Sequence, residues 1–61
     1  MKVSEFIRQI KKQGVKLYNH DKKHDVYINT KTGEKTRVPR HSSQELGVGI
    51  VEQMLKDLGL K

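Results

Sequence analysis

The chain has 61 residues, of which 13 are Lys or Arg and seven are Asp or Glu, so its net charge is +6 at pH 7. This length allows one domain, residues 1–61, with a thin core, because ~60 residues bury only ~60% of the surface that the unfolded chain exposes. The chain has no cysteine, which excludes disulfides and thiolate zinc sites. Its apolar runs are far shorter than the ~20 residues of a membrane helix, and no signal peptide is recognisable, so we expect a cytoplasmic protein without membrane contact.

The positive charge is concentrated in the first two thirds of the chain. Residues 1–40 hold 11 basic and four acidic side chains, whereas residues 41–61 hold two and three. A basic segment of this kind attracts polyanions, which favours nucleic acid or an acidic protein as the partner. The alternative is that the charge serves solubility alone.

The first element is predicted to be an amphipathic helix over residues 4–13. Ser4 is a suitable N-cap, Glu5 lies near the positive end of the helix dipole, and Gly14 supplies a left-handed residue that ends the helix. The apolar side chains recur at helical spacing and form one stripe: Val3, Phe6, Ile7 and Ile10.

The pattern then changes to the alternation that is typical of strands. Residues 15–20 and 25–30 form two predicted strands joined by a polar turn, and residues 35–38 form a third, stopped by Pro39. Gly33 can adopt positive φ in the second turn. The face that we expect to be buried carries Val15, Leu17, Val26, Ile28 and Val38.

A second helix is predicted from Gly49 to Gly59. Ser42 and Glu45 have capping-box spacing and predict a single helical turn before it. The apolar residues of the helix lie on one side and face the core: Ile50, Val51, Met54, Leu55 and Leu58. The predicted fold is therefore α+β, in the order helix, strand, strand, strand, helix, with both helices on one face of a three-stranded antiparallel sheet.

The opposite face of the predicted sheet combines aromatic rings with cations. It carries Lys16, Tyr18, Tyr27, Lys35 and Arg37. Aromatic rings can stack on bases while the cations hold phosphates. The alternative is that Tyr18 and Tyr27 are a cross-strand pair that stabilises the sheet.

The three histidines are the groups that can exchange protons near neutral pH: His20, His24 and His41. His20 and His24 would suit a metal if they shared a helix face, but they flank a turn. His24 follows Lys22 and Lys23, which attract a phosphate and favour a neutral imidazole. A neutral imidazole can remove the proton of an RNA 2′-hydroxyl without a metal. The alternative is a surface histidine in a polar turn.

These features together resemble the HicA toxins of bacterial toxin–antitoxin systems. The resemblance covers essentially the whole chain. It rests on the short first helix ending before Gly14, on His24 at the start of the second strand, on residues 38–41 (Val-Pro-Arg-His), and on the run from Gly49 to Leu60 that closes in Gly-Leu. The resemblance implies a fold similar to double-stranded-RNA-binding domains.

The resemblance also implies a metal-independent endoribonuclease that cleaves mRNA, needs no cofactor and forms a hetero-oligomer with a HicB-type antitoxin. His24 matches the catalytic histidine of the family. That histidine usually follows Gly-Ser, where this chain has Lys22 and Lys23. Two lysines add charge and bulk, which keeps phosphate attraction but loosens the geometry for proton transfer.

The predicted RNA contacts surround this histidine and one helix surface: Lys22, Lys23, Arg37, Arg40, Lys11, Lys12 and Tyr27. Arg8 shares the helix surface with Lys11 and Lys12. His41 is a candidate second acid–base group, or else a residue that fixes the turn after the third strand. The competing function is a binding module of the same fold that holds RNA or a protein without chemistry.

Overall fold

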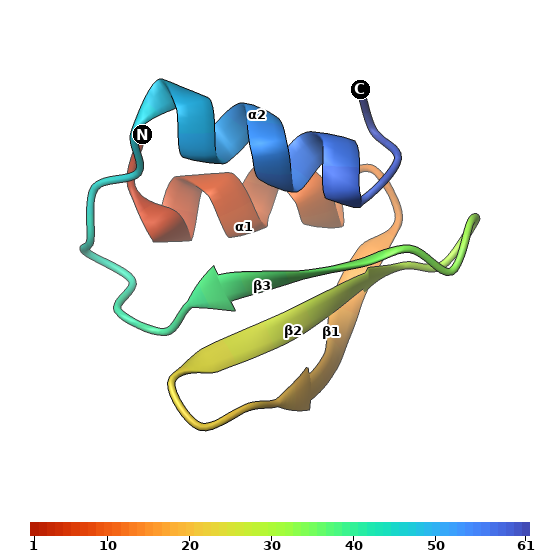
Figure 1. The fold of residues 1–61 in the computed structure, drawn as a ribbon, viewed down its shortest axis with the longest axis horizontal. Coiled ribbons are helices and arrows are strands. Elements are labelled where there is room, and N and C mark those ends of the chain that lie inside the picture. Colours follow the sequence, from red (N-terminus) through yellow and green to blue (C-terminus); the bar gives the residue numbers. More distant parts are fainter.

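Two helices cover one face of a three-stranded antiparallel sheet in the computed structural model, which describes all 61 residues (Figure 1). The elements follow the predicted order: α1 (Val3–Lys11), β1 (Val15–His20), β2 (His24–Asn29), β3 (Lys35–Pro39) and α2 (Val48–Asp57). The sheet order is β1-β2-β3, so β2 is central and the other two strands are edges. The α+β prediction is confirmed. Neither helix has the length and apolar character that crossing a membrane requires.

The first amides of α1 are capped by backbone carbonyls of a distant loop. The prediction that Ser4 is the N-cap is wrong, because the helix begins at Val3. The Val3 amide donates to the carbonyl of Gln44 at 3.0 Å, and the Ser4 amide to that of Ser42 at 3.1 Å. Backbone carbonyls thus satisfy the first amides of the helix. The loop after β3 supplies these carbonyls from a turn. The helical turn that was predicted at residues 42–45 does not form.

Helix α2 begins one residue earlier than predicted and ends as predicted. Gly59 has a φ of +70°, and its amide donates to the carbonyl of Lys56 at 3.0 Å. The Leu60 amide donates to the carbonyl of Leu55 at 2.8 Å. This pair of bonds is a Schellman motif, which requires the left-handed residue that glycine provides. Ile50 is 56% exposed, so its predicted place in the core is wrong.

The central strand faces the opposite way from the prediction. Tyr27 and Asn29 are buried beneath the helices, at 5% and 2% exposure. Val26 and Ile28 are only partly buried and lie on the other side of the sheet, because neighbouring strand residues alternate between faces. Both sets of side chains fit a half-buried strand, so alternation alone did not distinguish them.

The rest of the core combines the helix stripes with the edge strands. Val15 and Val38 are buried as predicted, whereas Leu17 on the edge strand β1 is 45% exposed. The core consists of Val3, Phe6, Ile10, Val15, Tyr27, Val38, Leu46, Met54 and Leu58.

Strand β1 has one irregularity in its pairing with β2. Leu17 pairs with Tyr27, and Asn19 pairs with Val26, so Tyr18 is an extra residue without a partner. Such a β-bulge bends the strand locally and redirects the side chain of the extra residue.

Asn29 joins the sheet to α2 through a buried hydrogen bond. Its Nδ2 donates to the backbone carbonyl of Leu58 at 2.7 Å, and its Oδ1 accepts the amide of Lys31 at 3.0 Å. One side chain therefore satisfies the end of the last helix and shapes the β2–β3 loop.

We expect Asn29→Ala to destabilise the fold by about 1–3 kcal/mol, because it leaves the Leu58 carbonyl buried without a donor. Asn19→Ala is the matched control, since Asn19 is exposed, and should change the free energy of unfolding by less than about 0.5 kcal/mol. Denaturant unfolding measures both values. Equal values for the two variants would contradict the role given to Asn29.

Candidate active site

His24 is the first residue of β2 and pairs with Pro39 at the end of β3. Its side chain is partly buried. Alternation places it on the face opposite the helices, together with Val26 and Ile28. His20 pairs with Asp25, so the two histidines on either side of the turn lie on opposite faces. They do not converge on a shared metal, and the chain has no group of three or more potential metal-ligating side chains.

A groove of about 500 Å³ runs along the edge strand β3 beside His24. Lys35 and Arg37 line it from β3, while Ile50 and Met54 line it from α2. The groove therefore joins an imidazole, two cations, the carboxylate of Asp57 and an apolar wall. Sequence reasoning missed this contribution of α2, because it assigned Ile50 to the core.

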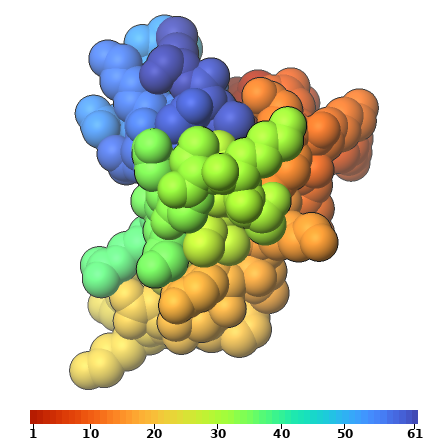
Figure 2. Space-filling model, turned by 90° about the vertical axis from the view of Figure 1, so that its right-hand side faces the viewer, coloured from red at the N-terminus to blue at the C-terminus, as the bar shows by residue number.

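The turn before His24 presents two lysines to solvent. The Asp21 amide donates to the His24 carbonyl at 2.7 Å, and the Asp21 carboxylate accepts the Lys22 amide at 2.8 Å. Lys22 and Lys23 are exposed, and neither forms an ion pair. The β1–β2 turn projects away from both helices at the bottom of the molecule (Figure 2). Both ammonium groups are free to bind an anion.

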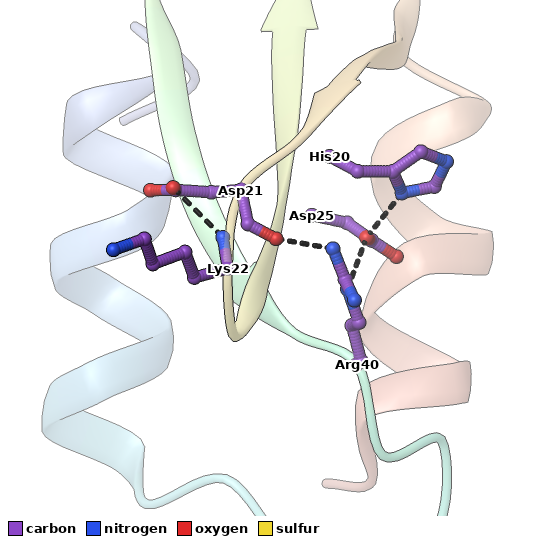
Figure 3. A network of polar contacts seen from close by, with 5 residues as sticks. All are labelled: His20, Asp21, Lys22, Asp25 and Arg40. Atoms are coloured by element: carbon purple, nitrogen blue, oxygen red, sulfur yellow. Dashed lines mark hydrogen bonds and ion pairs between the residues drawn. The ribbon is translucent and has the colours of Figure 1, made fainter.

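Arg40 fastens this turn to the end of β3. Its Nε donates to the Asp25 carboxylate at 3.0 Å, and its guanidinium also donates to the backbone carbonyl of Asp21 (Figure 3). His20 Nδ1 lies 2.7 Å from the same oxygen of Asp25. The guanidinium predicted to bind phosphate is thus held by protein groups and positions the segment that precedes His24.

The two partners of Asp25 favour its ionised form. Its pKa is lowered from the ordinary value, chiefly by the hydrogen bond with His20 and further by the one with Arg40, while desolvation acts in the opposite direction. The carboxylate therefore stays charged at neutral pH and keeps Arg40 in place.

The contact that holds Arg37 is weaker than the contacts that hold Arg40. Its Nε lies 3.3 Å from the Asp21 carboxylate, and its side chain is 70% exposed. An exposed ion pair of this kind contributes little to stability and is easily exchanged for a phosphate. The cations free to bind an anion near His24 are accordingly Lys22, Lys23 and Lys35, with Arg37 available by exchange.

Two of the other predicted site residues, Lys11 and Lys12, lie apart from His24. Lys11 and Lys12 are at the end of α1, where β1 begins, and Figure 1 shows this end opposite the β1–β2 turn. The six-residue length of β2 places the two ends roughly 17 Å apart. His41 is exposed in the loop after β3. The prediction that Tyr27 contacts RNA is wrong, because its ring is in the core. The same burial raises the pKa of its hydroxyl.

Of the two tyrosines that were predicted on the sheet face opposite the helices, only Tyr18 is exposed. It is 52% exposed, and the Lys35 ammonium lies 4.4 Å from the centre of its ring. The bulge at Tyr18 was not recognisable in the sequence, because alternation continues through it.

The fold and the groove define a class of small, basic α+β domains with one imidazole beside several free cations. Over residues 3–60 the sequence matches the family described as HicA toxin of bacterial toxin–antitoxin systems, and the chain belongs to this family.

Two curated relatives match over the full chain. It is 40% identical over 62 residues to "Probable mRNA interferase HicA" of Pseudomonas fluorescens (strain Pf0-1), covering 100% of this chain and 98% of the relative. It is 36% identical over 61 residues to "Probable mRNA interferase HicA 2" of Photorhabdus laumondii subsp. laumondii, with full coverage of both. No solved structure matches significantly.

We expect the contribution of Asp25 to stability to disappear in acid. Since its pKa is lowered by folding, the contribution is complete above the ordinary Asp pKa of about 3.9 and is lost as the pH falls through the lowered value. Asp25→Asn should therefore melt below the wild type at about pH 6, with the difference closing below about pH 4.

Thermal melts followed by circular dichroism test this expectation. Glu34→Gln is the control, because the Glu34 carboxylate forms no ion pair. It should follow the wild type at every pH. A Tm difference for Asp25→Asn that does not change with pH would show that the ion pairs are not its cause.

Proposed function

We propose that this chain is an endoribonuclease that cleaves mRNA, with His24 as its catalytic residue. The observation that carries the proposal is the position of His24, beside a groove and between unpaired lysines. The names of two relatives as mRNA interferases support the substrate class. Free cations on both sides of the imidazole suit an RNA phosphate, because phosphate contacts supply most of the affinity for nucleic acid.

The chemistry requires only the RNA and proton-transfer groups. His24 takes the proton from a ribose 2′-hydroxyl, and the 2′-oxygen attacks the neighbouring phosphorus. The bond from phosphorus to the 5′-oxygen breaks, and a cyclic phosphate remains. The leaving 5′-oxygen takes up a proton from water or from His41. Lys22, Lys23 and Arg37 stabilise the charge on the phosphate.

The structure of the turn before His24 makes the two lysines compatible with catalysis by His24. Family members usually have Gly-Ser there, and Lys22 and Lys23 replace these residues. The hydrogen bonds of Asp21 and the contact from Arg40 hold the backbone of this turn, while the lysine side chains project outward. Close approach of the phosphate to His24 then depends on the free ammonium groups.

The inhibitor in this proposal is a HicB-type antitoxin. Membership of a toxin–antitoxin family supports an antitoxin partner, and the net charge of +6 favours an acidic surface on it. Such a partner would block RNA by covering His24 and the free lysines.

We expect His24→Ala to lower the rate of RNA cleavage by about 10²–10⁴-fold while RNA binding is retained, because general base catalysis contributes about this factor. His20→Ala is the matched control on the other side of the turn, and should retain the rate within about tenfold. Gel assays of purified proteins measure cleavage, and induced expression measures growth arrest.

Cleavage by His24→Ala at the wild-type rate would refute the catalytic assignment. RNA binding by the wild type without any cleavage would instead identify the non-catalytic binding module.

We expect Lys22→Ala/Lys23→Ala to weaken RNA binding and to make it less sensitive to salt. Losing two phosphate contacts should reduce the slope of log K against log salt by about 1.4, since each contact to single-stranded RNA contributes about 0.7. Fluorescence anisotropy across a salt series measures the slope. Lys11→Ala/Lys12→Ala removes the same charge at the far end of the sheet. A larger loss of slope for that pair would move the main phosphate site away from His24.

A further inference from the structure

The sheet has an open face, the side opposite the helices, on which every charged side chain supplied by the strands is basic. Register places Arg37 opposite Val26, and Lys35 and Lys16 on either side of Ile28. These cations therefore share the open face with His24. The strands contain one carboxylate, Asp25, which faces the other way with Tyr27. The open face is electrostatically complementary to a polyanion.

One exposed aromatic ring stands on this face. Tyr18 is half exposed, and the Lys35 ammonium lies 4.4 Å from its ring centre, a contact that reaches from β3 across β2 to β1. The contact places Tyr18 on the open face, because Lys35 lies on that face. Neither the core nor the groove beside β3 uses this ring.

The ring lies close to the proposed reaction centre. Tyr18 sits between Leu17, the partner of Tyr27, and Asn19, the partner of Val26. It is thus two or three strand positions from His24, roughly 7–10 Å along the sheet. This separation suits the nucleotide next to the cleaved bond.

We propose that Tyr18 is a stacking site for a base of single-stranded RNA beside the bond that His24 cleaves, with Lys35 holding the adjoining phosphate. The inference rests on the proposed function and adds a substrate subsite to it. A base can pack against the ring in a single strand, whereas in a duplex it is already stacked and paired.

The relative strengths of the two contacts agree with this arrangement. The contact between Lys35 and Tyr18 is exposed, so losing it changes an equilibrium by only about 2- to 5-fold. Removing a base–aromatic stack commonly weakens binding by about 5- to 150-fold. An incoming base can therefore displace the ammonium from the ring, and the ammonium then lies beside the phosphate.

Binding measurements with ring variants test the site. All proteins carry His24→Ala, so that RNA is bound but not cut, and the probes are a short fluorescein-labelled single-stranded RNA of mixed sequence and its duplex. We expect Tyr18→Leu to weaken binding to the single strand by about tenfold. Tyr18→Phe should stay within about twofold, because it keeps the ring. Leu17→Ala removes an exposed apolar neighbour on the other face, and its binding should also stay within about twofold.

A second readout separates stacking from a structural effect. Proton NMR should show upfield shifts of the Tyr18 ring signals when the single strand is added, and unchanged signals with the duplex. Equal affinities of Tyr18→Leu and its parent, a loss shared by the duplex, or a similar loss in Tyr18→Phe would each overturn the stacking site. If the parent binds neither RNA, the proposed function fails with it. If the wild type binds and cleaves RNA while Tyr18→Leu matches it, only the stacking site fails.

Discussion

Because β2 is the central strand, its register with β1 and β3 decides which side chains enter the core and which reach the open face. In the observed register Tyr27 packs under the helices and Asn29 reaches the end of α2. His24 consequently faces outward beside the groove along β3. A shift of one residue would exchange the two sets of side chains. The placement of the candidate catalytic residue is thus a consequence of how the core is packed.

The charges around His24 divide into two groups with different tasks. Arg40 donates to the Asp25 carboxylate and to the Asp21 backbone carbonyl, and Arg37 pairs more loosely with the Asp21 carboxylate. These contacts hold the β1–β2 turn against β3. The lysines of the same region have no such partners. A net charge computed from the sequence treats all these cations alike. Only the structure distinguishes the guanidinium that positions the turn from the ammonium groups that remain free to bind an anion.

The order of elements was predictable because it depends on local signals, such as helical stripes and the glycines at 14, 33 and 59, all of which adopt positive φ. The facing of β2 was not predictable, because Val26 and Ile28 compete with Tyr27 for the core and the choice depends on the helices above them. His24 could be selected from its position and from the family resemblance. The exposure of Tyr18 was also predicted. The hydrogen bonds of Arg40 and the contact between Lys35 and Tyr18 were not, because they join segments that are distant in sequence.

The bulge in β1 also affects how the molecule behaves when crowded. An edge strand with a straight, unpaired backbone can recruit another chain and start aggregation, and proteins avoid this with bulges, charges and proline at their edges. Here β1 combines the bulge at Tyr18 with Lys16, while the other edge, β3, is short and ends at Pro39, which cannot donate a hydrogen bond. Both edges are therefore poor templates for a further strand, which disfavours edge-to-edge pairing between copies of this small domain.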